Sequence, residues 1–178
     1  MSQLTPKGFQ EITGVSRETL DKLKVYAELL QKWQKRINLV GRSTLPDLWR
    51  RHMLDAAQLY PMLPRDTQVL VDFGSGAGFP SLVLAIMGVP DVHSVESDSR
   101  KMAFQREVAR LTETPITLHN SRIEKIPTFP ADVITARALA PLKDLLEYAS
   151  PFAIEKTQCF FLKGKQAREE LTEANYIW

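Results

Sequence analysis

The sequence has little cysteine, a small net charge and no long apolar segment. Its 178 residues include one cysteine, Cys159, which excludes a disulfide or a thiolate metal cluster within the chain. Cys159 lies in the apolar run CFFL, so we expect a buried and inert thiol. No apolar run approaches the roughly 20 residues of a membrane helix, and residues 1–14 lack the apolar core of a signal peptide. We therefore expect a cytoplasmic protein with one α/β domain and a small appendage.

The formal net charge of +2 conceals a local excess of basic residues. Between Lys32 and Arg51 there are six basic side chains and one acid, Asp47, which gives a local charge of +5. Such a concentration suits an anionic partner such as nucleic acid. A solvated helix face is an alternative that the charge alone leaves equally open.

One glycine-rich stretch, VLVDFGSGAGFP at residues 69–80, organises the rest of the chain. Val69–Phe73 reads as a buried strand, the run Gly74–Gly78 must turn sharply, and a helix pattern starts at Pro80. Glycines can take positive φ and let a ligand approach the backbone, while the following helix offers unpaired N–H groups. The stretch therefore predicts a nucleotide-type pocket at the carboxyl end of a strand.

The spacing of the glycines narrows the choice of nucleotide. A dinucleotide-binding loop has the spacing G-x-G-x-x-G, but here the third glycine comes one residue early and Phe79 replaces the last one. Asp-x-Gly-x-Gly-x-Gly after a strand is the pattern of methyltransferases that use S-adenosylmethionine. Asp72 is then placed to meet the ammonium of the cofactor, directly or through water. Another nucleotide and a purely structural turn remain as alternatives.

Predicted helices and strands alternate along the chain. Residues 1–15 suggest a short helix or an arm, an amphipathic helix runs from Ser16 to about Gly41, and a second helix runs from Pro46 to about Leu59. We assign residues 1–63 to an N-terminal helical cap and residues 64–178 to the methyltransferase domain. After the loop the pattern predicts helices at Pro80–Gly88, Ser99–Leu111, Pro141–Tyr148 and Gln166–Ala174, and strands at Asp91–Ser97, Ile116–Arg122, Ala131–Arg137 and Gln158–Gly164. Such alternation requires a parallel sheet with helices on both faces.

Candidate binding residues follow these strands, where ligands bind in a parallel sheet. Glu96 ends the second strand and can accept hydrogen bonds from both ribose hydroxyls of an adenosine, although an exposed strand-end carboxylate is the alternative. The other strand ends carry Gly74–Gly78, Ile123 with Glu124, Arg137 and Lys163. In the second cap helix, His52 and Asp55 share a face. They lack a third metal ligand, so we expect a pair that docks the cap, with substrate contact as the alternative.

With these residues together, the sequence resembles one bacterial family, the small-subunit ribosomal RNA methyltransferase G, also called glucose-inhibited division protein B. The likeness covers nearly the full chain and rests on the order and spacing of several pieces: WQKRINLVG, RRHMLDA, VDFGSGAGFPSLVLAI, VESDSRKMAFQREV, NSRIEKI, ITARALAPL and FFLKG. The resemblance implies a class I, Rossmann-like methyltransferase fold that transfers a methyl group from S-adenosylmethionine to guanine N7 in the 530 loop of 16S rRNA.

The resemblance also implies roles for residues at matching motif positions. Gly74 and Phe79 in the loop, Ile123 and Glu124 beside the adenine, and Arg137 after the fourth strand would contact the cofactor. The pattern of the loop adds Asp72, Ser75, Gly76 and Gly78, and the position of Glu96 adds that carboxylate. Arg137 could clamp the carboxylate of the cofactor or orient the target base, with a structural salt bridge as the alternative. As phosphate contacts on the small ribosomal subunit we select Lys35, Arg36, Arg50, Arg51 and Lys163.

One departure from the family concerns the end of the chain. The family continues past Trp178 into two strands that form an antiparallel hairpin, and without them the fifth strand would be an exposed edge. We expect a monomer with S-adenosylmethionine as cofactor, S-adenosylhomocysteine as product, and neither metal nor membrane. The alternatives are a methyltransferase that acts on another RNA, a protein or a small molecule, an NAD-binding dehydrogenase, and a silent RNA-binding module.

Overall fold

A computed structural model describes residues 3–137, 139–163 and 170–172. Its sheet contains β1 (Val69–Phe73), β2 (Asp91–Val95), β3 (Thr117–His119), β4 (Ala131–Arg137) and β5 (Ala153–Leu162). The spatial order is β3-β2-β1-β4-β5, and every described pairing is parallel. The predicted parallel sheet is therefore confirmed, and the carboxyl ends of its strands share one edge.

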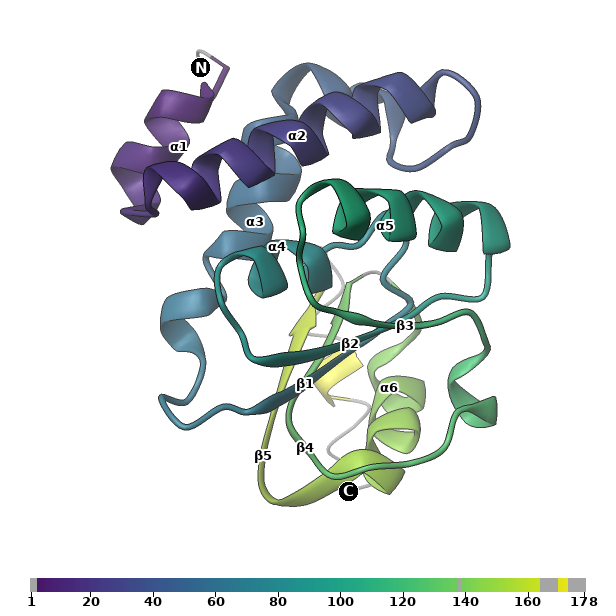
Figure 1. Cartoon of the computed structure of the whole chain (residues 1–178). Helices are drawn as coiled ribbons and strands as arrows, with labels where there is room; N and C mark the ends of the chain where they lie inside the picture. Colours follow the sequence, from purple (N-terminus) through teal and green to yellow (C-terminus); the bar gives the residue numbers. More distant parts are fainter. Residues whose placement is uncertain (1–2, 138, 164–169, 173–178) are drawn as a thin grey trace.

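Helices cover both faces of this sheet, as predicted (Figure 1). On one face lie α4 (Ser81–Ile86) and α5 (Ser99–Leu111), and on the other α6 (Leu142–Ala149) packs against β1 and β4. The predicted bounds of the helix at residues 99–111 are confirmed without change. Asp98 caps it by accepting hydrogen bonds from the backbone N–H groups of Arg100 and Lys101.

The N-terminal segment lies over α4 and α5 (Figure 1). It contains α1 (Pro6–Thr13), α2 (Arg17–Gln34), a 3-10 turn (Arg42–Asp47), a π-helical turn (Trp49–Leu54), α3 (Asp55–Ala57) and a second 3-10 turn (Tyr60–Met62). Buried side chains of these elements form one hydrophobic core with Leu82, Val83 and Phe104 of the sheet-covering helices. The cap is thus joined to the rest of the molecule by a continuous apolar interface.

Two predicted boundaries in the cap are wrong for local reasons. The first helix ends at Gln34 instead of near Gly41 because the Gln34 side chain bonds the turning backbone. Its Oε1 accepts from the N–H groups of Leu39 and Val40, at 2.9 and 3.0 Å, and its Nε2 donates to the Val40 carbonyl. The second helical segment starts at Arg42, so Pro46 lies inside the 3-10 turn rather than at a helix start.

The expectation of a buried Cys159 is also wrong. Cys159 is exposed because β5 is the last strand in the described sheet and pairs with β4 alone. Partial desolvation of the thiol still raises its pKa, which keeps it protonated at neutral pH. Strand β5 starts at Ala153, five residues before the prediction, and β3 is shorter than predicted. The predicted helix at residues 166–174 falls largely outside the described residues, although Glu170–Thr172 are helical.

In the described part of the chain, no helix combines the length and the apolar character needed to cross a membrane.

Candidate active site

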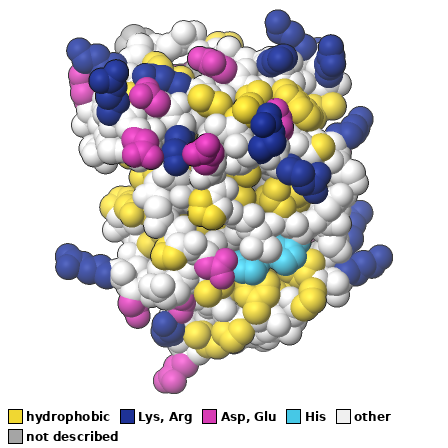
Figure 2. Space-filling model, viewed as in Figure 1, with side chains coloured by type: hydrophobic (Ala, Val, Ile, Leu, Met, Phe, Trp, Pro, Cys, Tyr) yellow, Lys and Arg dark blue, Asp and Glu magenta, His cyan; other side chains and the backbone are white. Residues whose placement is uncertain are grey.

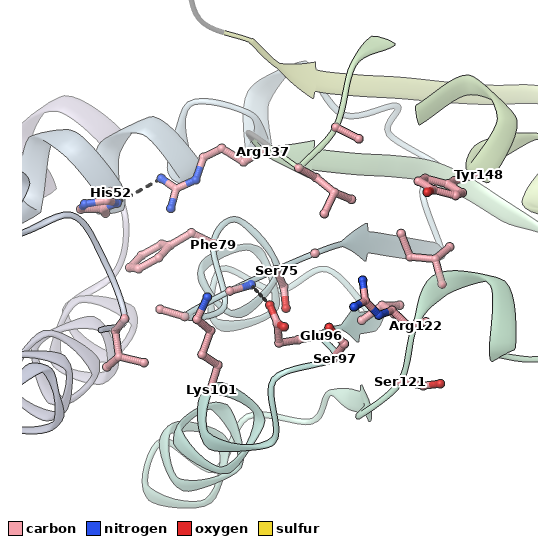
Figure 3. A pocket seen from close by; sticks show the side chains of 18 of the residues that line it. His52, Ser75, Phe79, Glu96, Ser97, Lys101, Ser121, Arg122, Arg137 and Tyr148 are labelled. Atoms are coloured by element: carbon pink, nitrogen blue, oxygen red, sulfur yellow. Dashed lines mark hydrogen bonds between the residues drawn. The ribbon is translucent and has the colours of Figure 1, made fainter. Parts of the chain in front are cut away.

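A cavity of about 690 Å³ opens at the carboxyl ends of the strands, under the cap (Figure 3). Its walls come from both halves of the chain. The strand ends and the loops that follow them contribute Gly74, Ser75, Gly76, Ala77, Phe79, Val95, Glu96, Ser97, Ser121, Arg122, Ile123, Glu124, Arg137, Leu139 and Ala140; Lys101 and Tyr148 come from α5 and α6, and the cap contributes Leu39, Thr44, Arg51, His52 and Asp55. The predicted meeting is therefore confirmed for the ends of the first four strands, whereas Lys163 after the fifth does not line the cavity. The cap forms part of the same cavity.

The glycine loop needs glycine at particular positions. Gly74, Gly76 and Gly78 have φ values of +64°, +60° and +91°, in the region that disfavours other residues. A Cβ at Gly78 would collide with the Leu82 side chain and would lie 3.1 Å from Tyr26 Oη. A Cβ at Gly76 would meet no protein atom within 4 Å. Since Gly76 lines the cavity, its missing side chain leaves room for a ligand against the backbone.

A buried polar cluster supports the loop from below. Ser94 Oγ lies 2.7 Å from both Ser75 Oγ and Gln105 Oε1, and Ser81 Oγ lies 3.2 Å from Ser94 Oγ. Gln105 Nε2 donates to Ser75 Oγ at 2.7 Å and to the Gly76 carbonyl at 2.9 Å. These four side chains are fully buried or nearly so. Satisfied buried networks hold one arrangement, so the loop is formed before any ligand arrives.

Glu96 lies beside the loop with its carboxylate fixed by two backbone donors. Its Oε2 accepts from the Gly76 N–H at 2.9 Å and its Oε1 from the Asp98 N–H at 2.7 Å. The side chain is only 8 % exposed but still lines the cavity (Figure 3). A carboxylate oxygen can accept more than one hydrogen bond. The geometry is therefore compatible with acceptance from a vicinal diol such as a ribose.

Asp72 lies beneath the loop rather than in the cavity. It is fully buried, and its two oxygens accept from the Ser81 N–H at 3.2 Å and the Thr135 hydroxyl at 2.9 Å. Burial raises its pKa to about 6, against the lowering effect of these hydrogen bonds. Neither Asp72 nor Gly78 is among the lining residues. Asp72 thus ties α4 to β1 and β4, and a direct contact with a ligand ammonium does not follow from its position.

Arg137 projects from the end of β4 towards the cap (Figure 3). Its Nη1 lies 3.1 Å from Nδ1 of His52, and its guanidinium carbon lies 5.2 Å from the centre of the Phe79 ring. A guanidinium can only donate, so His52 Nδ1 accepts and its proton sits on Nε2. That nitrogen lies 2.7 Å from Thr44 Oγ1, which is also 2.7 Å from the Gly41 carbonyl. Burial and the charges of Arg137 and Arg51 lower the pKa of His52 to about 4, in agreement with a neutral imidazole.

The cavity also contains residues that no sequence motif indicates. Ile123 and Glu124 line it as expected. Thr44, Ser97, Lys101, Ser121, Arg122, Leu139 and Tyr148 line it as well, although the sequence carries no pattern that points to them. Asp55, which we expected mainly to dock the cap together with His52, also lines the cavity. The sequence feature that indicates this position is the helical face that Asp55 shares with His52. No group of three or more metal-ligating side chains occurs among residues 3–137, 139–163 and 170–172.

The candidate phosphate-binding residues differ in exposure and in whether their charges are already paired with an acid of the protein. Lys35, Arg36 and Arg51 are exposed, and Arg51 lies at the cavity. Arg50 pairs with Asp47 at 3.3 Å, and Lys163 pairs with Glu170 at 2.6 Å and donates to the Ala140 carbonyl. Figure 2 shows Lys and Arg side chains projecting at the upper right, over the end of α2. The structure therefore leaves Lys35, Arg36 and Arg51 available to an anionic partner.

Comparisons with known proteins agree with this geometry. The ribosomal RNA small subunit methyltransferase G of Paramagnetospirillum magneticum is 62% identical over 166 residues, 93% of this chain and 81% of that protein. The protein of the same name from Rhodospirillum rubrum is 57% identical over 175 residues, 98% of this chain and 87% of that one. A crystal structure of ribosomal protein L11 methylase from Lactobacillus delbrueckii subsp. bulgaricus has the same fold, with a TM-score of 0.57 and 21% identity over 67% of this chain and 65% of that one. The family model described as rRNA small subunit methyltransferase G matches residues 19–178, and the chain belongs to this family.

Proposed function

We propose that the protein methylates N7 of a guanine in the 530 loop of 16S rRNA, with S-adenosylmethionine as the methyl donor. The observation that carries this proposal is the meeting of a preformed glycine loop, the fixed Glu96 carboxylate and the Arg137 guanidinium in one cavity. The membership of the family supplies the class of reaction and of substrate.

The residues of the cavity fit this cofactor. The open space at Gly76 admits a ligand against the loop, Glu96 can accept from ribose hydroxyls, and Ile123 provides an apolar wall for an adenine. Arg137 keeps donors for a carboxylate or for the target base. When bound, S-adenosylmethionine supplies a methyl group activated by its sulfonium and leaves as S-adenosylhomocysteine.

The protein has to position the base rather than remove a proton from it. Guanine N7 carries an in-plane lone pair and no proton, so the reaction needs no general base. Orientation of the reacting atoms at about 3 Å can lower the barrier by several kcal/mol. The cavity suits this role because its polar groups are already ordered by the networks around Ser75 and His52. Neutral His52 holds Arg137 in place and takes part in no proton transfer.

The cap and the sheet have different tasks in this proposal. Residues 64–178 would bind the cofactor, and residues 1–63 would present the rRNA through Lys35, Arg36 and Arg51, which contact phosphates without reading sequence. We leave out Lys163 because Glu170 already neutralises it. The partner would be the small ribosomal subunit in the cytoplasm, and the protein would act as a monomer. Light scattering of the purified protein checks its oligomeric state.

One assay tests the proposal. Small ribosomal subunits from a strain that lacks this methylation are incubated with the protein and labelled S-adenosylmethionine. We expect label in 16S rRNA as 7-methylguanosine, and mapping of the labelled nucleotide identifies the target guanosine. Subunits with 7-deazaguanosine at that mapped position should accept no label. The Arg137→Ala variant should transfer no methyl group, whereas Arg65→Gln, at the opposite edge of the sheet, should be as active as the wild type. Label in ribosomal protein or in other RNA would overturn the assignment of the substrate.

A further inference from the structure

Asp55 has an unusual position among the acidic residues of the cavity. It is half-buried in the cap and lines the cavity, and its carboxylate forms no hydrogen bond or ion pair with another described residue. By contrast, both oxygens of Glu96 accept from backbone N–H groups, and the exposed Glu124 interacts with the Tyr148 hydroxyl. A partly desolvated carboxylate without a partner is unfavourable, which suggests a ligand with donors.

Asp55 lies near a group that offers the opposite kind of hydrogen bond. Burial raises the pKa of the Asp55 carboxyl above its usual value, and the charges of Arg137 and Arg51 oppose that rise. Arg137 uses Nη1 for His52, and no other hydrogen bond of its guanidinium occurs with described residues. The Arg137 guanidinium, a hydrogen-bond donor, and the Asp55 carboxylate, an acceptor, therefore line one cavity and lie close enough to interact electrostatically.

This pair matches one edge of a guanine. The edge presents the acceptor O6, followed by the donors N1–H and N2–H, and N1 and N2 lie on the side of the base away from N7. Building on the function proposed above, we propose that Asp55 determines the specificity for guanine by accepting hydrogen bonds from N1–H and N2–H, while Arg137 donates to O6. Adenine presents the acceptor N1 at this edge and would leave the carboxylate without a partner.

The position of Asp55 on the cap agrees with this role. It follows His52 by three residues, so the two side chains share a helical face, and both line the cavity together with the glycine loop. In the proposed arrangement the base lies between Asp55 and the loop, with N7 towards the loop and its N1/N2 edge towards α3. Leu39 of the cap and the partly exposed Leu139 after β4 line the same cavity and offer apolar surface to the faces of the ring. An unpaired base can enter such a site from a single-stranded loop.

Inosine provides the matched substrate because it differs from guanosine by the absence of the N2 amino group. Small subunits are reconstituted with 16S rRNA that carries guanosine or inosine at the mapped position, and kcat/KM for methyl transfer is measured on both. We expect the wild type to prefer guanosine by roughly ten- to a hundredfold, the effect of one hydrogen bond to a charged acceptor. In Asp55→Asn, activity on guanosine should fall by a similar factor and the preference should shrink towards one. Glu28→Gln, an exposed acid on α2 outside the cavity, is the control and should keep the full preference.

Two further measurements distinguish a role of Asp55 in base recognition from a role in cofactor binding or in folding. Calorimetric titration with S-adenosylhomocysteine should give the same Kd for Asp55→Asn and the wild type, and thermal unfolding should show that the variant is folded. A preference in Asp55→Asn equal to that of the wild type would overturn the inference, as would a weaker Kd for the cofactor product with an unchanged preference, since Asp55 would then serve the cofactor. If the wild type transfers no methyl group to guanosine-bearing subunits, the proposed function itself fails, which is a distinct result.

Discussion

Nη1 of Arg137 lies 3.1 Å from Nδ1 of His52, which joins the end of β4 to the cap by one hydrogen bond across the cavity. The bond fixes the tautomer of the histidine. Because buried His52 holds Nη1, it also fixes the orientation of the remaining guanidinium donors of Arg137. The Phe79 ring limits the other side, with its centre 5.2 Å from the guanidinium carbon and 5.2 Å from the centre of the His52 ring. Arg137 is thus held between one contact from the cap, His52, and one from the glycine loop, Phe79.

We expect two substitutions of His52 to have different effects. In His52→Leu, Arg137 loses its hydrogen-bond acceptor. We expect kcat for methyl transfer to fall at least tenfold, because even a small misplacement of a positioning group strongly lowers the reaction rate. In His52→Asn, the side-chain oxygen can take the place of Nδ1 and most of the activity should remain. Single-turnover assays on small subunits measure the rates, and thermal unfolding of both variants controls for folding. Equal losses in the two variants would argue against the role of the acceptor.

Asp72 should make the stability of the protein depend on pH in a predictable direction. Its pKa is raised from 3.8 to about 6, so between about pH 4 and 6 the folded state retains a proton that the unfolded state has lost. As pH rises through this window, the wild type should lose about 3 kcal/mol of stability relative to Asp72→Asn.

Urea unfolding of both proteins at several pH values measures that difference. The comparison with Asp72→Asn is necessary because His52 changes the stability of the protein with pH in the direction opposite to Asp72. Its pKa of about 4 means that the folded state excludes a proton, so His52 contributes a gain in stability as pH rises from 4 to 6.5. The contribution of His52 is the same in both proteins and cancels. A difference in stability that does not change with pH would show that Asp72 is charged throughout.

The two glycines Gly76 and Gly78 should respond differently to alanine. At Gly78, with φ of +91°, a Cβ would collide with Leu82, and we expect a loss of about 2 kcal/mol or more in unfolding free energy. At Gly76, the Cβ would meet no protein atom, so the loss should be near 1 kcal/mol. Because that methyl group would occupy the cavity, Gly76→Ala should remain folded but bind S-adenosylhomocysteine at least tenfold more weakly. Denaturant unfolding and calorimetry distinguish these outcomes, and tight binding by Gly76→Ala would place the ligand elsewhere.

Arg51 should contribute to RNA binding through its charge. It is exposed at the cavity and has no ion pair with a described residue. Arg51→Gln should weaken binding to small subunits and reduce the slope of log K against log salt by about 0.7 to 0.9, the value for one phosphate contact. Arg65→Gln, at the amino end of β1, should leave the slope unchanged. Equal slopes for Arg51→Gln and the wild type would remove Arg51 from the interface.

The sheet and most of the helices could be predicted because their signals are local. The apolar run Val69–Phe73, the glycines after it and the capped helix Ser99–Leu111 each carry their own pattern. Failures occurred where distant residues decide the outcome. The end of α2 depends on Gln34 bonding the backbone of Leu39 and Val40, and no periodicity reports such a contact.

The site could be predicted in outline for a similar reason. Strand ends mark where ligands bind, which located Glu96 and Arg137 at the cavity. The sequence could not show that hydrogen bonds from Thr135 and Ser81 hold Asp72 beneath the loop. These bonds join Asp72 to residues that are 63 and 9 positions away along the chain. Nor could it show that the Asp55 carboxylate has no hydrogen bond with a described residue, because that property depends on every neighbour in the fold.

Tyr26 fastens α2 to the glycine loop. Its hydroxyl donates to the Ala77 carbonyl at 2.5 Å, and its ring stacks on Phe79 at 5.0 Å between centres. The cap therefore cannot swing away from the sheet without breaking a buried contact to the loop itself. A nucleotide docked on the cap and a methyl donor docked on the loop would share a common rigid frame, so the spacing between them would be built in during folding rather than created by a closing movement after the ribosome arrives.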